Sequence, residues 1–287
     1  GRLRHSLTQG AVQIIQQTSL PLVFCFARRA LIDLSVSAMA GKTAKIIAHR
    51  FGSKDAPETT LAALARSLEL GVEVVEFDVQ MCASGELVAF HDRDVRRTTN
   101  GFGPVKDLTL AQLKQLSAGA WFDPKFADEK IPLLEEVFAM VDGKAILNIE
   151  VKNMPFDWPE DKLLASLDRY AHRDKVIVSA FDHRCLARIH RKAKDLKLGM
   201  LFDGLLGIDM WSYAARIGAT HWHPWFEFIR PSDVAEAHSL GIEVNAWTAN
   251  TPEDWALCLA FGVDGIVTDD PAALKLYLAE RSGPLTP

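Results

Sequence analysis

The sequence predicts an α/β protein with the architecture of a (β/α)8 TIM barrel. Three observations lead to this fold class. From residue 45 to near the end of the 287-residue chain, short apolar runs alternate with helical patterns. Eight of these runs have the length and composition of strands. Glycines stand just past several helical patterns, where a left-handed cap is expected. Eight strands separated by helices within about 250 residues are typical of such a barrel.

Most of the expected strands are short runs rich in Val, Ile, Leu or Ala, as strands covered by helices should be. The ranges are 45–49, 73–79, 145–151, 175–180, 198–202, 220–223, 243–247 and 265–268. The expected helices fill most of the gaps and repeat their apolar residues at helical spacing. Their ranges are 60–70, 160–172, 183–195, 208–217, 232–240 and 252–261. Four of them are followed by glycine: Gly71, Gly218, Gly241 and Gly262.

Residues 80–142 depart from this alternation. The turn Ala83-Ser84-Gly85 precedes a run, 87–91, that we expect to return beside the second strand. Polar sequence and two short helical patterns, 109–116 and 133–141, follow. We interpret this stretch as a small insertion between the second strand and its helix, carried by one barrel domain that spans residues 41–287.

The first 40 residues have a different composition and are interpreted as an N-terminal extension. They contain four arginines and one acid, Asp33, and their apolar run 20–27 is far shorter than the ~20 residues of a membrane helix. Three interpretations remain open. In the first, Met39 is the natural start, and the residues before it lie outside the natural protein. In the second, these residues form an organellar transit peptide. In the third, they form either a secretory signal cleaved at Ala38-Met39-Ala40 or an interfacial anchor.

Composition excludes some classes of protein. The net charge of −5 and the lack of a basic stripe argue against nucleic-acid binding. Hydrophobic residues make up 48% and charged residues 24% of the chain, which is ordinary for a globular domain. The four cysteines are scattered without metal-binding spacing, which favours reduced thiols and a cytoplasmic location unless residues 1–40 direct the chain elsewhere. The oligomeric state is not predicted.

Charged residues two apart interrupt two of the expected strands. Glu76 and Asp78 lie in one, and Glu150 and Lys152 in another. Residues two apart in a strand share a face, so each pair projects together. His49-Arg50 and His91 also end apolar runs. Because the C-terminal strand ends of a barrel meet at one rim, we expect these side chains to form a metal-dependent hydrolytic site. Three carboxylates suit a hard divalent ion such as Mg²⁺ or Ca²⁺.

A series of motifs extends over residues 45–275. They are Ala48-His49-Arg50, Ala56-Pro57-Glu58-Thr59-Thr60, Glu76-Phe77-Asp78-Val79, residues 84–92, Arg97-Thr98-Thr99-Asn100-Gly101, residues 131–136, Asn148-Ile149-Glu150-Val151-Lys152, residues 246–250 and residues 262–271. In this set and order the chain resembles the glycerophosphodiester phosphodiesterase family. The resemblance implies metal-dependent hydrolysis of small-molecule glycerophosphodiesters to glycerol 3-phosphate and an alcohol, within lipid and glycerol metabolism.

The chemistry of that reaction suggests a role for each residue. Glu76, Asp78 and Glu150 would hold the metal ion. Arg50 and Lys152 would bind the phosphate, and Trp247 would form an apolar wall beside the substrate. The resemblance implies that His49 and His91 are the general acid and base, without saying which is which. The nucleophile is left open between water and the glycerol 2-hydroxyl. Two alternatives remain: a lysophospholipase D, and a barrel that binds phosphodiesters without turnover.

Two positions depart from the family pattern. Phe51 stands where the first motif usually has Gly. We expect its ring to lie beside His49 and Arg50 and to affect which leaving group the site accepts. The alternatives are that Phe51 has no effect on function or that it disables the site. Thr59 replaces Asn and is expected to cap the first helix. Elsewhere, Glu58 is expected to orient Arg50 or a backbone amide. Asp269 and Asp270, at the end of the last strand, are expected to cap the following helix, and the alternative is that they are ligands at the rim. His221 and His223 suggest packing or substrate contact more than a second metal.

Overall fold

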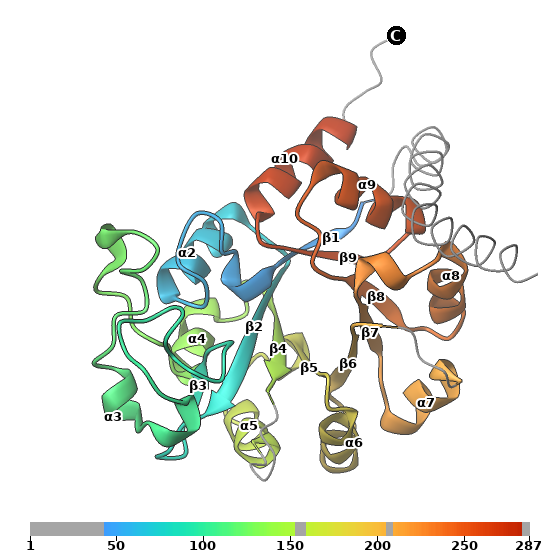
Figure 1. Ribbon diagram of the computed structural model, residues 1–287. Helices are drawn as coiled ribbons and strands as arrows, with labels where there is room; N and C mark the ends of the chain where they lie inside the picture. The colour runs from blue at the N-terminus through green and yellow to red at the C-terminus, as the bar shows by residue number, and fades with distance from the viewer. Residues whose placement is uncertain (1–42, 153–158, 205–208, 283–287) are drawn as a thin grey trace, which may run out of the picture.

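The computed structural model describes residues 43–152, 159–204 and 209–282, and within them the predicted barrel is confirmed. Eight parallel strands close on themselves because β1 pairs with both β2 and β9 (Figure 1). In barrel order they are β1 (Lys45–Ala48), β2 (Val74–Met81), β4 (Ile146–Val151), β5 (Val176–Ala180), β6 (Lys197–Phe202), β7 (His221–Pro224), β8 (Glu243–Ala246) and β9 (Gly265–Thr268). The expected extension, residues 1–40, lies outside the described residues.

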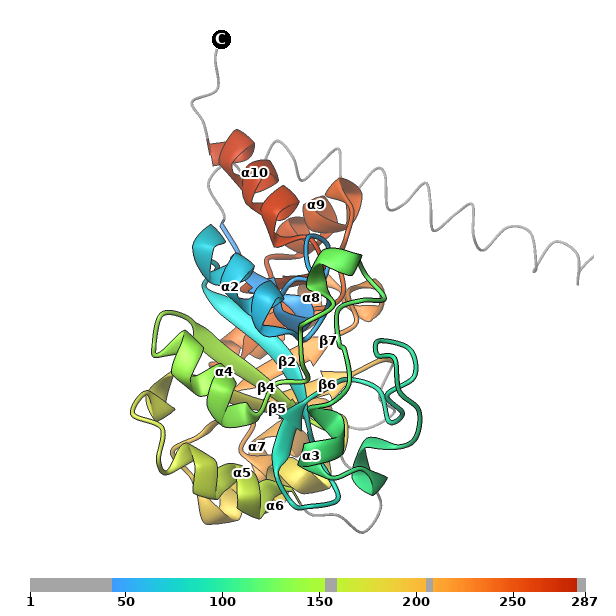
Figure 2. The same cartoon turned by 90° about the vertical axis from the view of Figure 1, so that its left-hand side faces the viewer.

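Helices lie on the outside of the barrel, one after each strand for most of the chain (Figures 1 and 2). They are α2 (Leu61–Leu70), α4 (Leu134–Val141), α5 (Glu160–Leu167), α6 (His183–Lys192), α7 (Met210–Ile217), α8 (Pro231–Ser239), α9 (Pro252–Phe261) and α10 (Pro271–Ser282). Short 3-10 turns occur at His49–Phe51, Arg173–Lys175 and Phe226–Phe228. None of the helices among the described residues is long and apolar enough to cross a membrane.

The start of α2 corrects one prediction. Thr60, not Thr59, is its N-cap: the Thr60 side chain accepts a hydrogen bond from the backbone N–H of Ala63. Thr59 has a left-handed φ of 56° and its hydroxyl is buried without a hydrogen-bond partner. The helix ends as predicted at Gly71, whose φ of 69° lets the chain reverse there.

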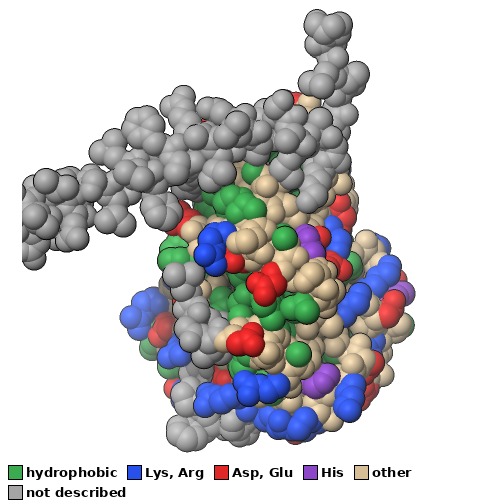
Figure 3. Space-filling view, turned by 90° about the vertical axis from the view of Figure 1, so that its right-hand side faces the viewer, with side chains coloured by type: hydrophobic (Ala, Val, Ile, Leu, Met, Phe, Trp, Pro, Cys, Tyr) green, Lys and Arg blue, Asp and Glu red, His purple; other side chains and the backbone are tan. Residues whose placement is uncertain are grey.

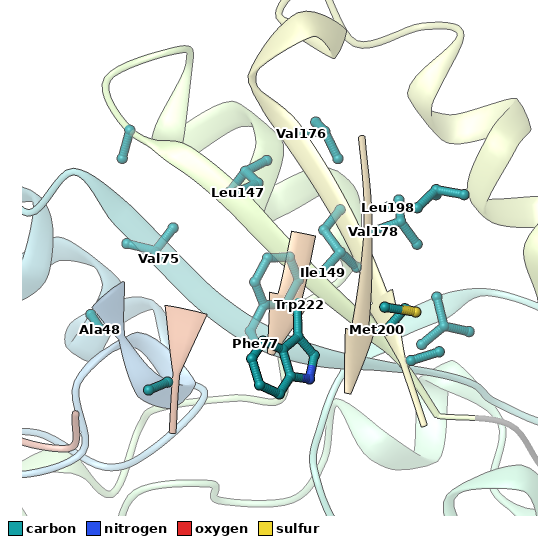
Figure 4. Packing of buried hydrophobic residues seen from close by; sticks show 14 of the residues in the cluster. Ala48, Val75, Phe77, Leu147, Ile149, Val176, Val178, Leu198, Met200 and Trp222 are labelled. Carbon is teal, nitrogen blue, oxygen red and sulfur yellow. The ribbon is translucent and has the colours of Figure 1, made fainter. Parts of the chain in front are cut away.

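The main hydrophobic core lies between the strands and the helices. Alternate side chains of the strands point outward into it, among them Val75, Phe77, Leu147, Ile149, Val176, Val178, Leu198, Met200 and Trp222 (Figure 4). The residues between them point into the barrel, where several are polar. In register, Glu76 pairs with Asn148 and Asp78 with Glu150. Because the apolar faces of β2 and β4 are buried against the helices, their charged faces both point into the barrel and lie side by side.

Residues 82–133 lie between β2 and α4 and have a small core of their own. β3 (Leu87–Ala89) runs antiparallel to β2, and the short elements η2 (Val105–Asp107), α3 (Leu110–Leu113) and η3 (Pro124–Phe126) follow. Their apolar side chains, including those of Val88, Phe90, Val95, Leu113 and Ile131, pack together. Figure 1 shows this part, around β3 and α3, on one side of the barrel next to β2. Because β3 pairs with the C-terminal half of β2, the residues that follow β3 lie beside the pocket end of β2.

The outer surface carries both apolar and charged side chains. Figure 3 views the side of the barrel on which α7 and α8 lie. Hydrophobic side chains gather in the middle of this face, and lysine and arginine side chains lie along its lower edge. Exposed apolar side chains of this kind are common on folded domains, so this face by itself indicates no function.

Candidate active site

A pocket at the C-terminal ends of the strands brings the predicted site residues together. Its lining includes His49, Arg50, Glu76, His91, Glu150, Lys152 and Trp247. Glu76 and Glu150 lie in β2 and β4, and the other five residues lie in the segments that directly follow β1, β3, β4 and β8. Asp78, also on β2, lies against the pocket with its side chain 1% exposed. All eight residues singled out from the sequence therefore lie at one rim of the barrel.

Three buried carboxylates form the most highly charged part of this pocket. One oxygen from each of Glu76, Asp78 and Glu150 lies within 4.8 Å of the others. Asp78 Oδ2 is buried without a partner, and Oδ1 forms an ion pair with the Lys152 ammonium at 2.8 Å. A single lysine does not balance three buried carboxylates. The three carboxylates, the spacing of their oxygens and the unpartnered Asp78 Oδ2 fit a divalent cation.

Crowding changes the protonation of these groups. Burial first, and then the charge of Asp78, raise the pKa of Glu76 to about 6 and that of Glu150 to about 8. Burial would lower the pKa of Lys152, but Asp78 and Glu150 outweigh it and the pKa is raised. The carboxylates therefore repel one another strongly when no positive charge lies between them. A bound cation would relieve that repulsion.

His49 is held by an acid from the other side of the barrel seam. Its Nδ1 lies 2.6 Å from Asp269 Oδ1. Asn250 Nδ2 donates to Asp269 Oδ2 at 2.6 Å and Ser53 Oγ donates to Oδ1 at 3.1 Å, so the carboxylate is itself fixed. Burial lowers the pKa of His49, but the bond to Asp269 and the charge of Glu76 outweigh it, and the pKa is raised overall. With Nδ1 engaged, Nε2 remains for the pocket.

His91 is also held by an aspartate, but its pKa is shifted in the opposite direction to that of His49. Its Nδ1 lies 2.6 Å from Asp92 Oδ1, and Arg97 Nε donates to Asp92 Oδ2 at 2.5 Å. The buried Gln80 amide donates to the carbonyls of Phe90, His91 and Asp92 at 2.8, 3.2 and 2.7 Å, which fixes this loop on β2. Burial, the largest effect, lowers the pKa of His91. The pKa values of the two imidazoles are thus shifted in opposite directions, and both rings keep Nε2 available.

Arg50 provides a fixed positive charge beside the carboxylates. Its backbone N–H donates to Glu76 Oε2 at 2.9 Å, and its Nη1 donates to Glu58 Oε1 at 2.9 Å. Glu58 also accepts from Arg97, so it orients Arg50 as expected and links it to the His91 loop. The Arg50 Nε is buried without a partner. An unused guanidinium donor in the pocket suits an anionic ligand.

Aromatic side chains form the outer part of the pocket. Trp247 is fixed by the bond from its Nε1 to the carbonyl of His223, at 2.7 Å. Phe181 meets Trp247 edge to face at 5.6 Å between ring centroids, and 44% of Phe181 is exposed. Trp225 stacks against Trp247, with the ring centroids 6.4 Å apart. Trp247 therefore supplies an apolar wall at the mouth of the pocket.

Phe51 does not lie at the pocket, and the expectation that it narrows the entrance is wrong. Its side chain is fully buried and packs against Phe77, with ring centroids 4.9 Å apart, in the core beneath the helices. The backbone explains the difference: Arg50 and Phe51 have φ values of 51° and 70°, so the turn rotates the Phe51 side chain away from its neighbours. Of these two residues, Arg50 alone lines the pocket.

Asp92 and Asp269 bind the two histidines of the pocket, and the sequence analysis did not predict this role for either aspartate. Asp270 accepts from the backbone N–H of Ala273 at the start of α10, as the capping prediction requires, but Asp269 faces His49 instead. Of these two pairs, only His91 and Asp92 are neighbours in the sequence, so only this pairing could have been suggested by the sequence. Among residues 43–152, 159–204 and 209–282, the three carboxylates are the only group of three or more closely spaced metal-ligand side chains. His221 and His223 belong to no such group.

Comparisons with known proteins agree with this geometry. A sequence model of the glycerophosphoryl diester phosphodiesterase family matches residues 49–273. A glycerophosphodiester phosphodiesterase of Caldanaerobacter subterraneus is 42% identical over 241 residues, 83% of this chain and 98% of that protein. An Oleispira antarctica phosphodiesterase, solved with the product sn-glycerol-3-phosphate, superposes with a TM-score of 0.77 at 28% identity, covering 85% of this chain and 99% of the other. The putative glycerophosphoryl diester phosphodiesterase of Silicibacter pomeroyi has a TM-score of 0.76, also at 28% identity, covering 86% and 97%.

Proposed function

The chain belongs to the glycerophosphoryl diester phosphodiesterase family, and we propose that it hydrolyses glycerophosphodiesters to glycerol 3-phosphate and an alcohol with the help of a divalent cation. It is thus an enzyme of the phosphoric diester hydrolase class. We place this reaction in lipid and glycerol metabolism, where such diesters arise from phospholipids that have lost their acyl chains.

The observation that carries the proposal is the buried carboxylate triad, in which Asp78 Oδ2 has no partner. Glu76, Asp78 and Glu150 would hold Mg²⁺ or Ca²⁺. When bound, such an ion neutralises charge on the phosphate oxygens. A barrel that only bound phosphodiesters would have no need to place two histidines with available Nε2 atoms beside this cluster.

The other residues have roles that follow from their surroundings. Arg50, with its unused Nε, would donate to a phosphate oxygen, and the charged Lys152 would add a second positive group beside it. The raised pKa of His49 favours it as the proton donor to the leaving alkoxide. The lowered pKa of His91 favours it as the base that takes the proton of the nucleophile.

A substrate and metal panel tests the proposal. The purified full chain is assayed on glycerophosphocholine, glycerophosphoethanolamine and a lysophosphatidylcholine, each with Mg²⁺, with Ca²⁺ or with excess chelator. Release of the free alcohol is measured, together with glycerol 3-phosphate from the first two substrates and lysophosphatidic acid from the third. We expect release of glycerol 3-phosphate from the first two, dependent on added metal. Tight binding of these diesters without any product would instead identify a non-catalytic barrel.

A further inference from the structure

One arginine, Arg97, connects two carboxylates at the rim of the barrel. Its Nε donates to Asp92 Oδ2 at 2.5 Å, and its Nη2 donates to Asp92 Oδ1 at 3.1 Å. Its Nη1 donates to Glu58 Oε2 at 2.9 Å, and its Nη2 also donates to Glu58 Oε1 at 2.6 Å. Every nitrogen of the guanidinium is therefore used, and each carboxylate is held by two hydrogen bonds.

Each of these carboxylates in turn holds a residue of the pocket. Asp92 Oδ1 lies 2.6 Å from His91 Nδ1. Glu58 Oε1 accepts a hydrogen bond from Arg50 Nη1 at 2.9 Å. The five side chains form one continuous hydrogen-bonded chain, here called the rim network, in the order His91, Asp92, Arg97, Glu58 and Arg50. It joins the segment after β3 to the segment after β1, and its two ends line the pocket.

The rim network differs from an ordinary surface ion pair. The Glu58 side chain is 10% exposed, that of Asp92 is 25% exposed and that of Arg97 is 46% exposed. Isolated exposed ion pairs contribute little to stability, whereas two-bonded arginine–carboxylate pairs in a network hold a fixed geometry. Burial would raise the pKa of Glu58, but the hydrogen bond from Arg97 and the charge of Arg50 outweigh it, so the pKa is lowered. Glu58 is therefore ionised and holds both arginines.

The rim network also decides which nitrogen of His91 carries the proton. Burial would raise the pKa of Asp92, but the hydrogen bonds from Arg97 and His91 outweigh it and lower this pKa to about 2. An ionised carboxylate can only accept hydrogen bonds, so the neutral His91 ring donates from Nδ1 and has no proton on Nε2. A general base must present an unprotonated nitrogen to the proton that it takes. Arg97 thus favours the tautomer that the proposed role of His91 requires.

The loop that carries Arg97 is fixed by contacts of its own. Thr99 Oγ1 donates to the carbonyl of Val95 at 2.7 Å, and Val95 belongs to the small core of residues 82–133. Asn100 Oδ1 accepts a hydrogen bond from the backbone N–H of Ser117 at 2.8 Å. These contacts give a structural reason for the sequence motif that begins at Arg97. They hold the guanidinium in place from a part of the chain that contributes no strand to the barrel.

We propose that Arg97 is a positioning residue that fixes Arg50 and His91 relative to each other across the pocket. It acts through Glu58 at one end and through Asp92 at the other. Arg97 itself is not among the described residues that line the pocket. The inference rests on the proposed function and extends it to residues 82–133, which supply the group that aligns the base with the bound phosphate.

The first test separates alignment from binding. Arg97→Ala should lower kcat on glycerophosphocholine about 10- to 100-fold, because small errors in alignment are costly for catalysis. KM should change far less, since Arg50 and the metal site remain. Arg97→Lys keeps a positive charge between the carboxylates and should keep the melting temperature of the wild type. Its kcat should stay low, because an ammonium cannot form both two-bonded pairs. Free guanidinium, well below denaturing concentrations, should restore part of kcat to Arg97→Ala.

The neighbouring arginine on the same loop is the matched control. Arg96 has a side chain that is 75% exposed, with Nη2 lying 3.6 Å from Asp94 Oδ2. Arg96→Ala should keep the kcat and KM of the wild type and gain nothing from guanidinium. Full kcat in Arg97→Lys, or a loss in Arg97→Ala that is confined to KM, would overturn the inference.

A double-mutant cycle tests the path from Arg97 to His91. Asp92→Asn removes the carboxylate through which the arginine acts on the ring. Arg97→Ala should therefore cost much less in the Asp92→Asn background than in the wild type, because residues in one network do not act additively. Losses that simply multiply would show that the two residues act separately, and the path would be refuted.

The ring nitrogens of His91 test the inference without any measurement of activity. Their ¹⁵N chemical shifts, assigned by comparison with His91→Gln, should show the proton on Nδ1 in the wild type and in Arg96→Ala. Both tautomers should appear in Arg97→Ala. If the protein hydrolyses no diester but shows this change, the proposed function fails and the positioning of His91 by Arg97 stands. If it hydrolyses the diesters and Arg97→Ala alters neither the tautomer nor kcat, hydrolysis stands and the inference fails.

Discussion

His49 and Asp269 are 220 residues apart and form a hydrogen bond of 2.6 Å between Nδ1 and Oδ1. The bond spans the seam where β1 pairs with β9 and closes the barrel. Closure of the barrel and orientation of a proposed catalytic histidine therefore depend on the same two strands. Asn250 and Ser53 hold the carboxylate in place, so the imidazole is fixed before any substrate binds.

Asp269→Asn should shift the pH dependence of the reaction. The bond to Asp269 raises the pKa of His49 against the effect of burial, so its loss lets burial lower that pKa. A proton donor must be protonated, and activity is lost as the pH rises through its pKa. The alkaline limb of the kcat/KM profile should therefore move to lower pH. Asp270→Asn, beside it in the chain, keeps a helix-capping side chain and should leave the limb in place; an equal shift in both variants would contradict the assignment.

Removal of any one carboxylate of the triad should reduce turnover by orders of magnitude. Glu76→Ala, Asp78→Ala and Glu150→Ala each delete one expected metal ligand. Excess chelator should abolish wild-type activity, and added Mg²⁺ or Ca²⁺ should restore it. The thermal midpoint of the wild type should rise with the ion, because binding to the folded state stabilises it, and the rise should be smaller in the variants. Glu69→Ala, on the exposed side of α2, is the control. Full activity in chelator would rule out the metal site.

The two histidines should be separable by the choice of leaving group. His49→Ala and His91→Ala should each slow hydrolysis of glycerophosphocholine about 10²–10⁴-fold. A nitrophenyl diester of glycerol needs no protonation of its leaving group, so only the variant without the general acid should recover on it. We expect that variant to be His49→Ala. His172→Ala, on the outer surface, serves as the control. Recovery of both variants, or of neither, would contradict the division of roles.

Phe51→Ala should lower stability and leave substrate preference unchanged. The ring is fully buried against Phe77, so its loss should cost about 3–5 kcal/mol in the free energy of unfolding. Urea unfolding measures that cost, and the ranking of choline and ethanolamine diesters measures preference. Phe181→Ala is the reciprocal variant: it lies at the pocket mouth, is 44% exposed, and should alter the ranking with little loss of stability. A changed substrate ranking in Phe51→Ala would contradict this prediction and show that Phe51 affects the pocket.

Local patterns in the sequence predicted most of the fold. The strands differ from their expected ranges by at most two residues at an end, because apolar runs and glycine stops are properties of neighbouring residues. The alternation in β2 also predicted its two faces: Val75 and Phe77 point into the core, and Glu76 and Asp78 into the barrel. The expected helix at 109–116 is shorter in the structure, at Leu110–Leu113, since that segment packs in a small core of its own.

The sequence by itself determined the eight-stranded barrel and the rim at which the charged strand ends meet, since both follow from periodicity and from the direction of parallel strands. Only the tertiary structure decided that Asp269 belongs to His49, that the Asn148 and Ser179 side chains face the pocket without partners, and that Phe51 faces away from it. The first two relationships depend on barrel closure and strand register, which bring distant segments together. The third depends on the left-handed backbone of one tight turn, a conformation that neither Arg50 nor Phe51 favours by itself.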